Sequence, residues 1–396
     1  MVHVQSRVRR ATVVAVAVAT LVVAALIGPA GGRVQGVATV TAPVTWDSAA
    51  QDIDSAELGA WALQPKIAWA STRDDPTITP PINAAEVYLM NPDLTGVERV
   101  TFTEGAGNGA PKLSPTGKRM VFDSNRFRFG APAVNRIAVT DIFLMDTVVS
   151  AKEPTDWASR EHIHLLRGAS SSWHPDGRRI AYHASASGTG VPIRTDPGSA
   201  TSDSDIFSMS VDEFLAGEEA PMNLTNSPDW IDDDPDYSPD GQKIAFTRHG
   251  VDDPHANSFT AEIHVMNADG SGLTRLTFND EEERGPAWSP DGSMITYACR
   301  KGSNATFEIC VMNADGSGQT RLTFNDTPDL TPGYSLDGSQ IVFHRTVGTG
   351  QLFRMNADGS EQTQLTFSAG VNVLAHQGVI KVTALEGETT KGMLRN

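Results

Sequence analysis

Acidic side chains recur at matching places in this chain of 396 residues, and they are its first candidates for chemistry. Asp232, Glu283 and Asp329 each precede a proline by three residues, and Asn108 precedes Pro111 by the same interval. Oxygen donors without Cys or His partners suit Ca²⁺ better than Zn²⁺. If these places surround one axis, the four side chains form a binding site in which the three acids could hold a metal ion.

The rival interpretation is a solvated acidic rim whose members point apart. Ala369 and Gly168 occupy the corresponding places in two other repeats, so a ring of oxygen ligands would be incomplete and would need water or a ligand to complete it. This interpretation is the simpler one, and under it we expect no cofactor. Ca²⁺ is the cofactor that the alternative interpretation predicts.

Motifs of established catalytic chemistry do not occur in the sequence. There is no G-x-S-x-G, H-E-x-x-H, C-x-x-C or G-x-x-x-x-G-K-[ST] pattern, so no nucleophile elbow, zinc motif or phosphate loop is predicted. His264 stands where other repeats carry Tyr88, Phe143, Phe207 and Phe353, which indicates a packing role. We predict no catalytic residue.

A repeated unit positions the candidate residues. The stretch E-I-H-V-M-N-A-D-G-S-G-L-T-R-L-T-F begins at Glu262, and related copies begin 46 and then 43 residues later, at Glu308 and Gln351. Weaker copies begin at Glu86, Asp141 and Asp205, which makes six. A fixed period of this length is the signature of a repeat architecture.

Each unit is predicted to form four antiparallel strands. Apolar and other residues alternate at 262–266, and N-A-D-G at 267–270 has the composition of a hairpin turn. S-P-D-G at 289–292 fits a type I turn between the short apolar stretch 286–288 and the strand at 294–299. Six such units predict an all-β fold, a six-bladed β-propeller.

Ring closure should join the two ends of the propeller. Lys66–Ala70 is the second strand of a first unit that lacks its first strand, and Val371–Ala375 follows the last repeat and supplies a candidate. Val379–Leu385 has no obvious place in this scheme. A seventh sheet is therefore left open.

The repeat P-x-W-S-P-D-G … E-I-x-V-M-N-A-D-G-S-G … R-L-T-F resembles the propeller repeats of the TolB family, over roughly residues 60–385. The resemblance implies the fold, and it implies little about function because propellers host many activities. TolB-like proteins of the Tol–Pal system also carry an α/β domain before the propeller. Only a few dozen residues are available for one here.

The N-terminus resembles a secretory leader. Arg7, Arg9 and Arg10 precede the apolar run 11–27, and small residues follow it. We predict a signal peptide at 1–30, a linker at 31–59 and the propeller at 60–390, with the product secreted or in the periplasm or cell envelope. An uncleaved membrane anchor is the alternative, and only then is a membrane contact expected.

Charge and cysteine content agree with export. The formal net charge of −17 disfavours binding to nucleic acid. Cys299 and Cys310 are the two cysteines, and an even number in an exported chain favours a disulfide; two buried free thiols are the alternative.

These observations predict a monomeric, non-catalytic scaffold that binds a protein or an extracellular ligand. Binding is expected on the face that carries the long loops 127–140, 184–204 and 250–261, together with Trp230 and Phe129. Two enzymatic functions are the alternatives to a binding scaffold. One is a metal-dependent propeller hydrolase of the lactonase kind, which needs carboxylates and Asn around the axis. The other is a polysaccharide lyase, which needs His and Arg there.

Overall fold

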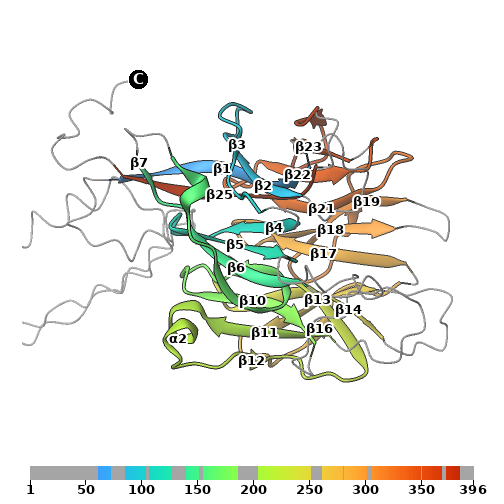
Figure 1. Cartoon of the computed structure of the whole chain (residues 1–396). Coiled ribbons are helices and arrows are strands. Elements are labelled where there is room, and N and C mark those ends of the chain that lie inside the picture. Colours follow the sequence, from blue (N-terminus) through green and yellow to red (C-terminus); the bar gives the residue numbers. More distant parts are fainter. Residues whose placement is uncertain are drawn as a thin grey trace, which may run out of the picture. The chain divides into compact units, whose positions relative to one another are not determined.

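The computed structural model describes residues 61–72, 85–103, 107–125, 140–150, 155–185, 204–250, 261–279, 281–300, 306–348, 350–367 and 372–383. They belong to one compact unit, Asp54–Asn396. Their strands form six sheets, and each sheet contains a four-stranded antiparallel blade (Figure 1). The predicted six-bladed β-propeller is confirmed, and no seventh sheet occurs among these residues.

We number the blades along the chain and letter their strands A to D. Blade 1 comprises β25 (Asn372–Thr383), β1 (Trp61–Ser71), β2 (Glu86–Met90) and β3 (Glu98–Arg99). Blade 2 comprises β4 (Asn108–Leu113), β5 (Arg119–Ser124), β6 (Asp141–Asp146) and β8 (Ile163–Arg167). Blade 3 comprises β9 (Ala169–Trp173), β10 (Arg179–Ala184), β11 (Asp205–Ser210) and β12 (Met222–Asn223).

The remaining blades follow the same order. Blade 4 comprises β13 (Trp230–Tyr237), β14 (Lys243–Gly250), β15 (Glu262–Asn267) and β16 (Thr274–Arg275). Blade 5 comprises β17 (Glu282–Trp288), β18 (Met294–Arg300), β19 (Phe307–Asn313) and β20 (Thr320–Arg321). Blade 6 comprises β21 (Asp329–Tyr334), β22 (Gln340–Arg345), β23 (Gln351–Asn356) and β24 (Thr363–Gln364). Outside the blades lie β7 (Val149–Ser150), the 3₁₀ helix η5 (Trp157–Ser159) and helix α2 (Val211–Ala216).

Side-chain bonds within the repeated turns fix the hairpins. In the turn at 289–292, Asp291 accepts hydrogen bonds from the Ser289 hydroxyl at 2.6 Å and from the Ser293 amide at 3.0 Å. Gly270 ends the other kind of turn with φ of 87°, and a Cβ there would lie 2.6 Å from the Leu224 carbonyl oxygen in the preceding blade. These aspartates and glycines therefore serve the turn geometry, as their sequence pattern predicts.

The core lies between neighbouring blades. Val265 and Leu276 of blade 4, for example, belong to one buried cluster with Trp288 and Tyr297 of blade 5. Aromatic side chains of strands B and C pair within five of the blades. His264 takes the strand C place of such a pair, 5.9 Å from the ring of Phe246, so its predicted packing role is confirmed. Burial lowers its pKa to about 4.

Strand β25 closes the ring from the C-terminal end. It pairs antiparallel with β1 along its length, from Ser71↔Asn372 to Trp61↔Thr383 (Figure 1). The prediction that a segment after the last repeat supplies strand A of blade 1 is confirmed from Asn372 onward; Val371 lies outside the described residues. The unplaced residues 379–383 continue the same strand.

The A strands form the inner ring, since each contacts the A strands of both neighbouring blades. They are longer than the three-residue stretch predicted from P-A-W: β17 begins at Glu282 and β13 at Trp230. The residues just before these short apolar stretches are therefore also part of strand A. Their polar side chains find partners in the junctions described below. The three long loops and Phe129 lie outside the described residues, apart from the loop ends.

Candidate functional site

The four predicted site residues occupy equivalent places near the beginnings of strands A. Asp232 pairs with Arg248, Glu283 with Cys299, Asp329 with Arg345 and Asn108 with Ser124 on the adjacent strand B. All four are almost fully buried, with 0 to 2 % of their surface exposed. They lie at junctions between blades and are not solvated side chains of a rim.

Two of the acids form buried ion pairs with arginine. Asp329 accepts hydrogen bonds from Nε and Nη2 of Arg345 at 2.6 and 2.7 Å. Asp232 accepts the same pair of bonds from Arg248, also at 2.6 and 2.7 Å. Burial raises the pKa of Asp232, and the Arg248 guanidinium opposes that rise. Both carboxylates are therefore committed to a bidentate partner.

Each place also connects to strand C of the preceding blade. Asn108 donates to Glu86 at 2.7 Å, and Asn325 donates both to Asp329 at 2.9 Å and to Glu308 at 3.1 Å. We call such a group of linked polar side chains a junction cluster. It fastens strand A of one blade to the strand C acid of the blade before.

Blades 1 and 3 complete the comparison. Asn372 occupies this place in blade 1, where it accepts a bond from Ser71 at 2.8 Å and donates to Gln351 at 3.3 Å. The alignment with Ala369 was therefore wrong, and Ala369 itself lies outside the described residues. Gly168 takes this place in blade 3, where a Cβ would lie 2.7 Å from the ring of Tyr182.

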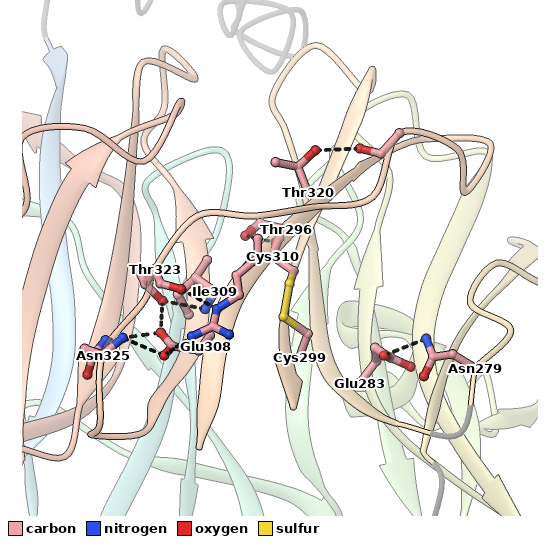
Figure 2. The surroundings of a disulfide bond; sticks show 12 residues. Asn279, Glu283, Thr296, Cys299, Glu308, Ile309, Cys310, Thr320, Thr323 and Asn325 are labelled. Carbon is pink, nitrogen blue, oxygen red and sulfur yellow. Dashed lines mark hydrogen bonds and ion pairs between the residues drawn. A yellow bond between two sulfur atoms is a disulfide. The ribbon is translucent and has the colours of Figure 1, made fainter. Parts of the chain in front are cut away.

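Glu283 alone among the three acids lacks an arginine. Its strand B neighbour is Cys299, which forms a disulfide with Cys310 of strand C, with the Cα atoms 5.9 Å apart (Figure 2). Asn279 donates to Glu283 Oε1 at 3.0 Å, and Oε2 is buried without a hydrogen-bond donor. Burial, and then the carboxyl group of Glu262, raise the pKa of Glu283 to about 8. At neutral pH this side chain is therefore mostly protonated.

The three predicted metal ligands, Asp232, Glu283 and Asp329, lie in three different junction clusters. Asp232 and Asp329 are each paired within their own junction, and Glu283 accepts a bond from Asn279 in a third. No group of three or more His, Cys, Asp or Glu among the described residues is placed to hold a metal ion. The expectation of a Ca²⁺ site at Asp232, Glu283 and Asp329 stays a prediction, for which a test is given below.

Sequence reasoning missed a second group, the bulge cluster, which comprises Asp123, His183, Asp233, Asp234 and His249. Strands A carry a β-bulge, with the non-glycine residues Ser170 and Asp234 at φ of 51° and 52°. Asp123 accepts a bond from the Ser170 amide at 3.1 Å, and His183 accepts one from the Asp234 amide at 3.3 Å. Each bulge is thus held by strand B of the blade before it.

The bulge cluster gathers titratable groups from three consecutive blades. Burial, and then the charge of Asp234, raise the pKa of Asp123 to about 7, although the Ser170 amide opposes the rise. Burial also acts on Asp233, but His183 and His249 outweigh it and lower the Asp233 pKa to about 2. Asp123 Oδ1 and His249 Nδ1 are buried without a hydrogen-bond partner. Such a cluster can hold or transfer a proton near neutral pH.

A third feature is exposed. Four phenylalanines end the repeated Val/Leu-Thr-Phe motif, and we call them the phenylalanine crescent: Phe102, Phe278, Phe324 and Phe367, which are 48, 73, 73 and 78 % exposed. They follow strand D, where the chain crosses to the next blade. A motif of Thr and apolar residues has the composition of a strand. The recurrence of an aromatic residue directly after a polar Thr is the sequence signal for an exposed ring at this place.

The crescent residues stand on a rigid support. The buried Thr277 accepts a bond from the Ile263 amide at 2.9 Å and donates to Glu262 at 2.5 Å. Arg275 donates to the Thr277 carbonyl oxygen at 2.5 Å, and its guanidinium lies 5.0 Å from the centre of the Phe278 ring. Blades 1 and 5 repeat this arrangement, with guanidinium–ring distances of 4.7 Å at Phe102 and at Phe324.

Among the described residues, no helix has the length and apolar character needed to span a membrane.

Residues 217–345 and 285–380 match a family model described as the TolB beta propeller domain. The chain also resembles dipeptidyl-peptidase 5 from Porphyromonas gingivalis, with 36 % identity over 67 residues; the alignment covers 17 % of this chain and 10 % of that protein.

Solved structures show the same fold. The crystal structure of TolB from Acinetobacter baumannii matches with a TM-score of 0.57 and 18 % identity, over 79 % of this chain and 66 % of that chain. A chain of a nidogen/laminin complex matches with a TM-score of 0.50 and 10 % identity, over 82 % of this chain and 100 % of that one. Hydrazine synthase from Kuenenia stuttgartiensis matches with a TM-score of 0.56 and 12 % identity, over 89 % and 50 %.

Proposed function

We propose that this chain, a TolB-like β-propeller, is an exported, non-catalytic scaffold that binds a protein partner. The binding surface is the crossing face, which we define as the side of the ring where strand D of each blade connects to strand A of the next. The phenylalanine crescent is the observation that carries this proposal. Aromatic side chains exposed by about three quarters, and repeated on neighbouring blades, are typical of interaction surfaces.

The burial of the junction acids supports a structural role for them. Asp232 and Asp329 neutralise arginines inside the ring, and Asn108 bonds to the strand C acid of blade 1. These side chains fasten blades together, so they are not available to a substrate at the surface. The charged residues selected from the sequence thus help to build the scaffold.

Export is proposed from the leader-like N-terminus and from the pairing of Cys299 with Cys310. Disulfides persist in oxidising compartments such as the periplasm and the extracellular space. The nidogen/laminin and TolB structures show that this fold occurs in proteins of diverse function, so the identity of a partner does not follow from the fold.

The bulge cluster is the observation that favours an enzyme as the second candidate. Asp123, Asp233 and Asp234 offer carboxylates, and His183 and His249 of strands B lie beside Asp233. A hydrolase or lyase of the kinds considered above would use such groups. Replacing Asp123 and Asp234 by Asn would abolish such an activity, whereas it should leave partner binding at the crossing face unchanged.

Site-specific photo-crosslinking in the producing cells tests the binding proposal. A photoreactive phenylalanine is placed at position 324 on the crossing face, or at Gln242 in an exposed turn on the opposite face. We expect one protein to be crosslinked from position 324 and not from 242, and to bind again when both purified proteins are mixed. Equal crosslinking from the two positions, or none from 324, would contradict the proposal.

A further inference from the structure

The phenylalanine crescent occupies a continuous arc of the ring. Its members belong to blades 4, 5, 6 and 1, and blade 6 is next to blade 1 because β25 closes the ring. Blades 2 and 3 carry Arg167 and Asn226 at the corresponding place. The four rings therefore form a row along one arc of the crossing face, and Trp230 at the start of β13 is a further exposed ring, at 44 %.

The rings are presented in a fixed arrangement. Thr101, Thr277, Thr323 and Thr366 precede them and are buried, and each accepts a bond from the amide of a strand C residue at 2.8 to 3.0 Å. A surface whose anchor residues are already held in place loses little conformational entropy on binding. The repeat also places the four rings in equivalent positions, so a partner meets the same feature in successive blades.

The charge around the crescent is negative. Glu281, which is partly exposed, follows Phe278, and the exposed Asp326 follows Phe324, in a chain of net charge −17. The arginines beneath the rings do not offset these acids, because Arg99, Arg275 and Arg321 are paired with the strand C acids Glu86, Glu262 and Glu308. A partner that fits here therefore combines apolar side chains with positive charge.

We infer that the phenylalanine crescent binds an extended, basic segment of another protein, whose apolar side chains contact the rings of successive blades. This inference rests on the proposed function and adds the chemistry of the partner to it. An extended segment matches an arc of repeated, equivalent contacts, and its basic residues match the acids that follow Phe278 and Phe324.

Synthetic peptides test this inference with the intact protein. The probe is a fluorescent peptide of repeated Lys-Leu-Lys-Gly; its counterparts replace Lys by Glu or Leu by Ser. We expect the first peptide to bind more tightly than either counterpart. The triple variant F278S, F324S and F367S should weaken its binding at least about tenfold, as expected for the loss of several anchor residues.

A matched variant controls for the loss of exposed apolar surface elsewhere. Leu215 of α2 and Met222 of blade 3 are 44 and 47 % exposed, and L215S with M222S should leave peptide binding unchanged. Undiminished binding to the triple variant, or equal binding of all three peptides to the native protein, would overturn the inference. A partner crosslinked from position 324 that lacks a basic segment would overturn the inference while leaving the proposed function intact.

Discussion

At the scale of single residues, Glu283 differs from its counterparts because no guanidinium faces it. Asn108 and Asn372 hold neutral amides at this place, and Asp232 and Asp329 are paired with arginine. Glu283 instead faces the carboxyl group of Glu262, and two buried carboxylates in contact cannot both ionise. A proton is therefore the counterion of this junction.

This proton makes stability depend on pH. The folded-state pKa of Glu283 is about 8 against 4.5 for a free glutamate, so between these values only the folded state holds the proton. Its contribution is present at pH 6 and is lost as the pH rises through 8. Between pH 6 and pH 9 the wild type should therefore lose about 2–3 kcal/mol more stability than the Glu283→Gln variant loses.

Chemical denaturation of both proteins at the two pH values measures this difference. The exposed Glu218→Gln substitution is the matched control, since it removes one acidic charge outside the junctions. Identical pH profiles for the wild type and Glu283→Gln would contradict the protonated junction.

The Ca²⁺ expectation can be tested with the same variant. Because guanidinium groups occupy Asp232 and Asp329, we expect millimolar Ca²⁺ to leave the melting temperature unchanged, as in a protein without a site. Differential scanning calorimetry with Ca²⁺ and with Mg²⁺ decides the matter. A rise specific to Ca²⁺ that Glu283→Gln abolishes would establish the site predicted from the acids.

At the scale of elements, blade 5 replaces two features of its neighbours at once. Cys299 stands where β14 and β22 carry Arg248 and Arg345, and Cys310 stands where the other blades carry an aromatic residue or His264. A covalent bond between strands B and C thus replaces an ion pair and a ring pair.

The disulfide should stabilise the ring. Replacing both cysteines by serine should lower the free energy of unfolding by about 2–3 kcal/mol, as expected for a bond that closes so short a loop. Thermal or denaturant unfolding of the exported protein measures this loss. Alkylation by iodoacetamide without reductant, followed by intact mass, should show no modified thiol; two modified cysteines would exclude the bond.

Closure by β25 gives a second prediction for an element. Deleting residues 372–396 leaves β1 and the inner ring without a partner strand, so we expect the whole ring to lose its cooperative transition. Circular dichroism on heating measures this. Deleting only residues 385–396, beyond β25, is the control, and a melt of the longer deletion that matches the full-length protein would refute the closure.

The repeats show what sequence could and could not predict. Period, turn chemistry and the missing strand of the first unit depend on local patterns, so the blades and their closure could be derived. The partners of Asp232 and Asp329 could not, because Arg248 and Arg345 lie 16 residues further along the chain and nothing local links them. Spacing from proline identified equivalent places but not whether they face the axis or a neighbouring blade.

The crescent was missed for a related reason. A phenylalanine after Leu-Thr looks like one more strand residue, and only the structure shows that the buried threonine turns the next side chain outward. The bulge cluster likewise depends on contacts between blades, as when Asp123 reaches the Ser170 amide.

At the scale of the whole molecule, the interior of the ring and its crossing face differ. Side chains in the interior contact neighbouring blades, whereas the crescent residues on the crossing face are exposed. Junction clusters and interblade cores consume most of the buried acids and the large apolar side chains. The four crescent rings stay exposed on one arc, and this asymmetry is what a binding scaffold requires.

The most direct test of this account is the affinity of the crosslinked partner for the native protein and for variants, measured by titration calorimetry. We predict that F324S with F367S weakens binding at least about tenfold. L215S with M222S should bind like the native protein, and all three should melt at similar temperatures. Unchanged affinity in the double phenylalanine variant would contradict the claim that this propeller works by binding through its crossing face.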